Sequence, residues 1–112
     1  CLAADTGKLL WRNDDFRGSV PRFATSSSPI VADGSCIVAV GSERDGGLVA
    51  YDLATGDEKW KWTGDGAAYG SPVLISLDGT EAIIAPTAGK MPKFTMPDAK
   101  QMVPAKMRKR RE

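Results

Sequence analysis

The sequence contains the same phrase twice. LVAYDLATGDEKW, residues 48–60, has a shorter relative at the start of the chain, CLAADTGKLLW, residues 1–11. In both, a Thr-Gly pair is followed after three residues by Trp, at an offset of 49 residues. Ser-Pro and two apolar residues stand at 28–31 and again, 43 residues on, at 71–74, each time ahead of an Asp-Gly turn. Phrases that recur in the same order at this spacing indicate a repeat architecture.

Short β-branched and aromatic runs, separated by glycine-containing turns, fill the chain up to about residue 90. No amphipathic helical pattern of useful length occurs there. The turns read DGS, RDGG, ATGD, GDG and LDGT, in which Gly supplies the positive φ that tight turns require. We therefore expect an all-β fold with strands at 28–33, 36–41, 47–53, 58–63, 71–76 and 81–86.

The expected strands differ in how their apolar residues are arranged. IVAV and LVAY are apolar on both faces, so each must be covered on both sides. EKWKW instead places Trp60 and Trp62 on one face and Lys59 and Lys61 on the other. Lysines on an outer strand also discourage edge-to-edge pairing. The pattern combines buried inner strands with one outer strand that has a solvent-exposed face, and it repeats every 43–49 residues. It indicates four-stranded antiparallel β-propeller blades better than a two-layer sandwich.

The complete copy of the phrase carries its own turn chemistry. Gly56 allows the hairpin to pass through a left-handed position, and Asp52 and Thr55 can bond the backbone of the turn. Trp60 is then expected to lie over the neighbouring blade. In this form, A-x-D-x-x-T-G-x-x-x-W, the phrase resembles the tryptophan-docking repeat of quinoprotein-type (pyrroloquinoline-quinone-like) β-propellers. The structural repeat residues on this basis are Thr6, Gly7, Trp11, Ala50, Asp52, Thr55, Gly56 and Trp60.

The resemblance covers residues 1–90 and implies a ring of about seven or eight blades. Known members include quinoprotein dehydrogenases and the outer-membrane assembly lipoprotein of Gram-negative bacteria. On this template the chain holds an outer hairpin at 1–12, one full blade at 28–63 and a partial blade at 71–86. We therefore expect an incomplete ring, cut from a larger one. The first copy of the phrase has Ala3 in place of the Asp, which weakens the capping of its turn.

Other propeller families fit less well. The chain has no His and no Trp-Asp dipeptide, which excludes the G-H…W-D repeat. A kelch blade is closer, because an apolar run, glycines and a Tyr occur in sequence. However, Gly41-Ser42 replaces a glycine doublet, and the stretch from Asp52 to Trp60 is longer than a kelch blade has.

The composition changes after residue 90. Residues 91–112 contain all four Met, three of seven Pro and seven Lys and Arg against two Asp and Glu, whereas residues 1–90 carry a net charge of −4. We expect this basic Met/Pro-rich tail to be irregular or disordered. A frameshift or misjudged gene end would produce such a segment. The alternatives are a basic tail that touches nucleic acid or an acidic surface through 106–111, and an inert solvated tail.

Candidate chemistry is sparse. Asp14-Asp15 and the run 42–47 are interpreted as solvated loops, and the serines of 25–28 as a strand entry, because no His exists to act as a base. No phosphate-binding glycine motif occurs, and Cys1 and Cys36 are interpreted as small buried hydrophobes. We therefore assign no catalytic, cofactor-binding or metal-binding residue.

The resemblance leaves three hypotheses for function. In the first, the chain is a piece of a non-catalytic propeller that binds protein partners through its surfaces. In the second, it is a piece of a dehydrogenase whose pyrroloquinoline quinone and calcium are held elsewhere, because the adjacent cysteines typical of that site are missing here. In the third, it is a truncated product without its own function. The family implies a periplasmic or exported parent, although no signal peptide is visible, and no apolar run approaches the roughly 18 residues of a membrane span.

Overall fold

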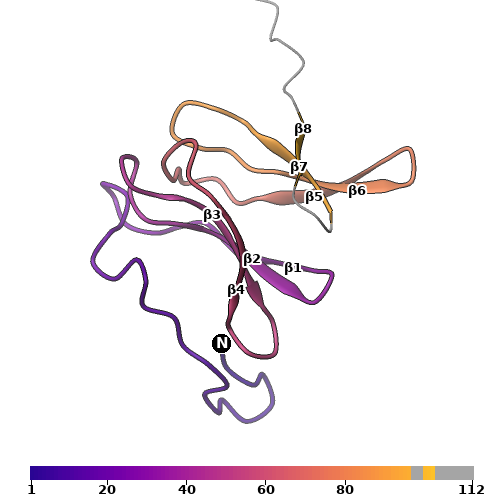
Figure 1. The fold of residues 1–112 in the computed structure, drawn as a ribbon. Coiled ribbons are helices and arrows are strands. Elements are labelled where there is room, and N and C mark those ends of the chain that lie inside the picture. The colour runs from indigo at the N-terminus through magenta and orange to yellow at the C-terminus, as the bar shows by residue number, and fades with distance from the viewer. Residues whose placement is uncertain (97–99, 103–112) are drawn as a thin grey trace, which may run out of the picture.

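The computed structural model describes residues 1–96 and 100–102, and all regular elements in this part of the chain are β-strands. They form two four-stranded antiparallel sheets, each in sequential strand order (Figure 1). The expected all-β architecture of blade-like sheets that do not close into a ring is thereby confirmed. The first sheet comprises β1 (Ile30–Ala32), β2 (Ser35–Val40), β3 (Gly47–Asp52) and β4 (Glu58–Trp62). The second comprises β5 (Val73–Leu77), β6 (Thr80–Ile84), β7 (Lys93–Thr95) and β8 (Lys100–Met102).

The two sheets start with the same hairpin. β1 and β2 are joined by Asp33-Gly34, with φ values of 48° and 66°, and β5 and β6 by Asp78-Gly79, with 49° and 79°. Positive φ at both central residues is the type I′ geometry, whose twist matches that of the flanking strands. Asp and Gly adopt it at low cost, so the repeated dipeptide sets the same strand register in both sheets.

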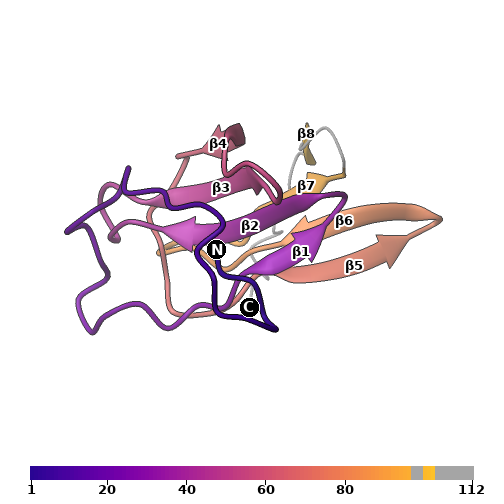
Figure 2. The ribbon, with the colours of Figure 1, turned by 90° about the horizontal axis from the view of Figure 1, so that it is seen from below.

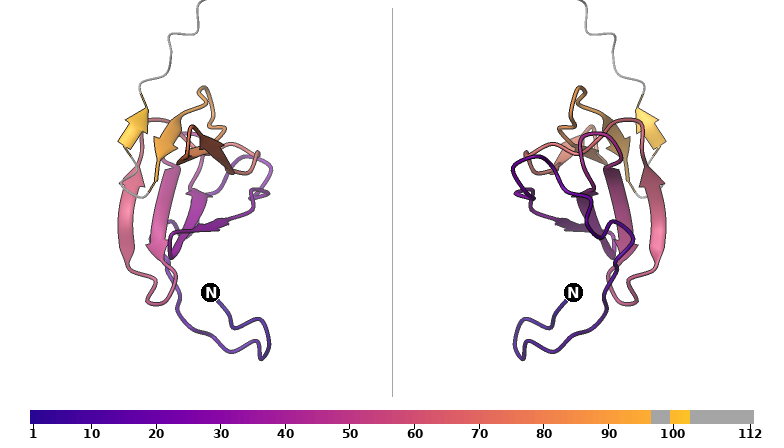
Figure 3. Two further views of the ribbon diagram at one scale, coloured as in Figure 1. Left: turned by 90° about the vertical axis from the view of Figure 1, so that its right-hand side faces the viewer. Right: turned by 90° about the vertical axis from the view of Figure 1, so that its left-hand side faces the viewer.

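The core lies between the sheets (Figures 2 and 3). The first sheet contributes fully buried residues from β2 and β3, with the indoles of β4 packed around them. The second sheet contributes side chains from β6, β7 and the residues that follow each of them. The buried members of this cluster are Ala32, Ile37, Leu48, Ala50, Ile83, Ala85, Phe94 and Met96.

The N-terminal segment covers the other face of the first sheet. Residues 1–27 contain one isolated antiparallel bridge, Leu2 to Leu9, within the expected outer hairpin. This segment lies on the side of the first sheet away from β7 and β8 (Figures 1 and 3). β3 is therefore covered on both faces, which explains why its residues 47–51 are all buried.

The second sheet continues past the expected boundary at residue 90. β7 pairs with β6, and β8 pairs with β7, so the partial blade at 71–86 gains two short strands. The physical reason is the alternation of Phe94, Thr95 and Met96, which turns two large apolar side chains towards the core. Residues 97–99 and 103–112, including the basic end at 106–111, lie outside the described residues. The described residues include no helix that could span a membrane.

Candidate functional site

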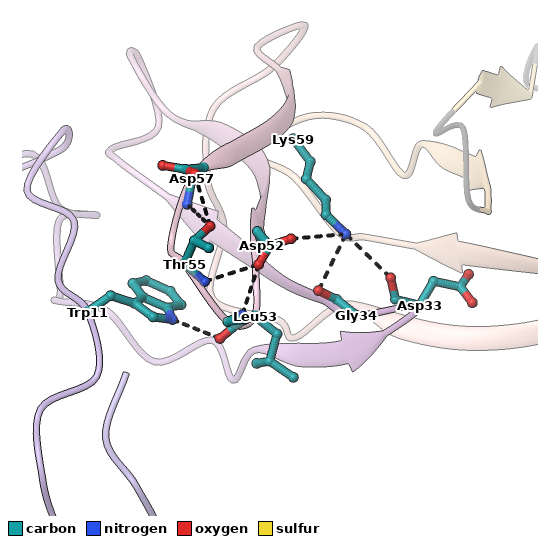
Figure 4. A network of polar contacts seen from close by, with 9 residues as sticks. Trp11, Asp33, Gly34, Asp52, Leu53, Thr55, Asp57 and Lys59 are labelled. Atoms are coloured by element: carbon teal, nitrogen blue, oxygen red, sulfur yellow. Dashed lines mark hydrogen bonds and ion pairs between the residues drawn. The ribbon is translucent and has the colours of Figure 1, made fainter.

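The turn between β3 and β4, residues 52–57, carries the repeat motif (Figure 4). The Asp52 carboxylate accepts hydrogen bonds from the backbone N–H groups of Ala54 at 2.9 Å and Thr55 at 3.0 Å. These bonds, with that of Thr55 the largest contribution, lower the pKa of Asp52. Gly56, at φ 78°, donates its N–H to the Asp52 carbonyl at 2.8 Å and closes the turn.

The neighbouring hairpin is tied to this turn. The Leu53 N–H donates to the Gly34 carbonyl at 2.9 Å. The Lys59 ammonium lies 3.5 Å and 3.4 Å from the carbonyls of Asp33 and Gly34, and 3.8 Å from the Asp52 carboxylate (Figure 4). One lysine therefore links the two turns at this end of the first sheet.

Trp11 docks on the turn from the N-terminal segment. Its indole Nε1–H donates to the Leu53 carbonyl at 2.8 Å (Figure 4). Its ring lies 5.9 Å from that of Tyr51, centroid to centroid. A Cβ added at Gly56 would lie 2.6 Å from two carbons of the Trp11 ring. Gly56 therefore serves both the turn and the indole, and no other residue fits both roles.

The first copy of the motif builds the same turn without the carboxylate. Ala3 N–H donates to the Lys8 carbonyl, and Gly7 N–H, at φ 69°, donates to the Ala3 carbonyl, both at 2.8 Å. Thr6 Oγ1 accepts from the Lys8 N–H at 3.2 Å, as Thr55 Oγ1 accepts from the following Asp57 N–H. The backbone bonds match those of 52–57. The bonds to the Asp52 carboxylate and the bond from the Thr55 hydroxyl to Asp57 have no counterpart in the first copy.

Trp60 and Trp62, on β4 of the first sheet, pack against the second sheet rather than on a turn. The Trp60 ring stacks on Phe94 at 5.8 Å between centroids, and Trp62 meets Phe94 edge-on at 5.4 Å. Ala50, fully buried, pairs with Trp60 across β3 and β4, so a small residue beside the indole leaves space for Phe94. The motif residues thus form two seams, one on each face of the first sheet.

Polar loops gather at the opposite end of the first sheet, where residues 41–46 and 63–72 lie (Figure 2). We call these two loops and residues 85–92 the loop edge. The Asp45 carboxylate accepts from the hydroxyls of Ser19, at 2.6 Å, and Ser42. These hydrogen bonds, with that of Ser19 the largest, lower the pKa of Asp45 to about 2.

A second carboxylate joins the two sheets within the loop edge. Asp65 accepts from the Thr87 hydroxyl at 2.7 Å and from the Gly89 N–H at 2.6 Å. The Gly89 bond is the largest cause of the lowered pKa of Asp65. Lys90 donates to the Gly64 carbonyl at 3.1 Å, and Ala67 bridges to Thr87. These contacts fix the connection between the sheets.

Comparison with known proteins places this arrangement in a family. The family model described as outer membrane protein assembly factor BamB matches residues 1–101. The chain belongs to this family of pyrroloquinoline-quinone-like repeat proteins. The matched region contains both copies of the motif, the whole first sheet and β5 to β7.

A similar curated protein is the quinohemoprotein alcohol dehydrogenase of Comamonas testosteroni. It is 36% identical over 64 residues, which cover 54% of the present chain. The same residues span 9% of the dehydrogenase, so the chain matches only a small part of that protein. No solved structure matches the chain significantly.

A cleft of about 440 Å³ lies in this family member between the N-terminal segment and the outer face of β2. Cys1, Trp11, Phe16, Cys36 and Tyr51 are among its lining residues. Cys36 is half-buried, and burial raises the pKa of its thiol. The expectation of a buried Cys1 is wrong, because its side chain is exposed at the cleft. Within residues 1–96 and 100–102, no three His, Cys, Asp or Glu side chains group together as a metal site would require.

The loops considered as candidate chemistry are satisfied by their own contacts. Asp14 forms an ion pair with Arg12 at 3.0 Å on the surface, and the Asp15 N–H donates a hydrogen bond to Asn13 Oδ1. Asp45, in the run 42–47, accepts hydrogen bonds from the hydroxyls of Ser19 and Ser42. The sequence interpretation missed Phe23 and Tyr69 because neither belongs to the repeat. The two rings pair on the surface, Tyr69 from the loop edge and Phe23 from the N-terminal segment. The sequence signal that could have indicated Phe23 is its position as an isolated aromatic residue in the polar segment that precedes β1.

Proposed function

We propose that the chain forms blades of a non-catalytic propeller whose complete form serves as an interaction scaffold. The observation that carries the proposal is the use of Trp11, Trp60 and Trp62 in packing. Their rings contact Tyr51, Gly56 and Phe94 across the two seams. The motif side chains therefore stabilise blade against blade, and the loop edge remains as the surface for a partner.

The family description supports a protein partner for this scaffold. It names an assembly factor for outer membrane proteins. By analogy, this chain would act where such proteins are assembled, which agrees with an exported parent.

The second candidate is part of a quinone-dependent dehydrogenase, favoured by the likeness to the alcohol dehydrogenase. A calcium-held quinone requires a cluster of oxygen ligands, and the described residues provide no group of acids able to form one. The indoles that could face a planar ring are engaged in the seams. The described residues therefore do not fit the group.

A site-specific cross-linking experiment separates the two functions. A photoreactive residue is placed at Arg44 or Ala68 of the loop edge, and a matched one at Asp57 on the opposite end, in the full protein within its own cells. The scaffold predicts covalent products with outer-membrane assembly proteins from the loop edge alone. The absence of such products, together with quinone- and calcium-dependent dye reduction on alcohols by the same protein, would establish the dehydrogenase instead.

A further inference from the structure

Phe23 stands at the tip of a tight turn with its ring in solvent. It is 76% exposed, more than any other large apolar side chain among the described residues. The Ala24 N–H donates to the Pro21 carbonyl at 2.9 Å, and Ala24 holds φ at 82°. A left-handed conformation is unfavourable for a residue with a Cβ, and such outliers concentrate at functional sites. Pro21 is buried, so the turn is anchored while its tip is exposed.

Two other loops hold this turn in place. The Phe23 N–H donates to the Tyr69 hydroxyl at 3.0 Å, and the Arg22 N–H donates to Glu43 Oε1 at 2.9 Å. The Tyr69 hydroxyl in turn donates to Glu43 Oε1 at 3.4 Å. The Ser26 hydroxyl donates to the Tyr69 carbonyl at 3.0 Å. The exposed ring is therefore fixed by contacts from the β2–β3 and β4–β5 loops rather than left on a free arm.

The side chains at this tip combine two aromatic rings with a cation. The ring of Phe23 lies 6.2 Å from that of Tyr69, and the Arg22 guanidinium lies 5.2 Å from the Phe23 centroid. Among the described residues Arg22 forms no ion pair within 4 Å, and its charge acts on the nearby Glu43 carboxylate only as a minor cause of the lowered pKa of Glu43. Glu43 is engaged by the Arg22 backbone and Tyr69. Exposed Tyr and Arg beside a preorganised aromatic are typical of binding hot spots.

We propose that Arg22, Phe23 and Tyr69 form a docking surface for a peptide segment of a partner protein that carries an apolar side chain next to a carboxylate. The apolar group would cover the Phe23 and Tyr69 rings, and the carboxylate would pair with the Arg22 guanidinium. A carboxylate can bind a guanidinium through two parallel hydrogen bonds. This inference rests on the proposed scaffold function and names the surface and chemistry of its partner.

The test uses the purified full chain and a displayed library of random 12-residue peptides. Selected peptides are synthesised, and their affinities are measured on wild type and on the variants Phe23→Ala and Arg22→Gln. Val31→Ala is the matched control, because Val31 is a 58% exposed apolar residue on β1. We expect peptides with an acid beside an aliphatic or aromatic residue, and affinity lower by about tenfold or more in both tip variants but unchanged in the control. Phe23→Ala leaves the core intact, so its circular dichroism should equal that of wild type.

Three results would overturn the inference. Peptides that bind wild type and Phe23→Ala equally show that the surface is wrong while the scaffold function stands. Peptides without acids show that the assigned partner chemistry is wrong. A failure to enrich any peptide, while a glycan array gives binding that Phe23→Ala abolishes, replaces the protein partner with a carbohydrate and removes support from the scaffold as well.

Discussion

Gly56 and the indole of Trp11 are in direct contact across the seam between the N-terminal segment and the first sheet. A Cβ at position 56 would lie 2.6 Å from the Trp11 ring, closer than real Cβ contacts come. The same glycine is at φ 78° and closes the turn with Asp52. Local turn geometry and blade packing therefore both depend on the absence of a side chain at position 56.

Substitution of Gly56 by Ala should destabilise the chain strongly. We expect a loss of about 2–4 kcal/mol in the free energy of unfolding, from left-handed strain and displacement of the indole together. The measurement is urea unfolding followed by tryptophan fluorescence. Gly7→Ala is the matched control, because Gly7 is at φ 69° with nothing within 4 Å of an added Cβ. It should cost only the strain, about 1–2 kcal/mol. Equal losses in the two variants would show that the indole does not dock on Gly56.

The Asp at the start of the motif can be tested by exchange between the two copies. Asp52→Ala removes the bonds to the Ala54 and Thr55 N–H groups and should lower the melting temperature. Ala3→Asp supplies the same acceptor to a turn whose backbone bonds already match, so it should raise the melting temperature. Calorimetry on the two variants checks both signs. A lower melting temperature for Ala3→Asp would contradict the equivalence of the turns.

Phe94 should link the two sheets. It is 1% exposed and touches both Trp60 and Trp62. Phe94→Ala should cost about 3–5 kcal/mol, the usual loss for a buried Phe, and shift the tryptophan emission to longer wavelength. Phe94→Leu, which keeps most of the volume, should recover more than half of the loss. Phe23→Ala is the control for an exposed Phe and should leave both readouts unchanged.

The pH dependence of stability should contain a contribution from Asp45. Its pKa is about 2 in the folded chain against 3.8 ordinarily, so the folded state binds fewer protons between these values. This stability is present above pH 3.8 and is lost as the pH falls towards about 2. Acid unfolding of wild type and Asp45→Asn, followed by circular dichroism, tests it. The variant should show a weaker fall in stability in this window, and an identical fall in both chains would assign the effect to other carboxylates.

Much of the fold could be predicted from local signals. The Asp-Gly turns define both type I′ hairpins, and the two-sided apolar pattern of IVAV and LVAY predicts burial of β2 and β3. The Thr-Gly-x3-Trp spacing predicts the turns at 3–8 and 52–57. These features depend on residues close together in the sequence, whose conformational preferences are strong.

The rest depends on contacts between distant residues. β7 was not predicted because residues 91–102 lack the motif, and three residues around Phe94 become a strand only when β6 and the indoles of β4 are in place. The exposed position of Phe23 follows from two long-range hydrogen bonds. The Phe23 N–H donates to Tyr69, 46 residues further along the chain, and the Arg22 N–H donates to Glu43, 21 residues further along. Neither of these partners carries a recognisable pattern of its own.

Hydrogen exchange of the full chain tests the central claim, that two blades fold together across the Trp60–Phe94 seam. We expect the backbone amides of β2–β3 and of β6–β7 to be protected to a similar degree, and protection of both pairs to fall together in Phe94→Ala. Protection of β2–β3 alone, with residues 73–96 exchanging at the rate of an unfolded chain, would contradict the account. Exchange at that rate throughout would instead favour a product with no fold of its own.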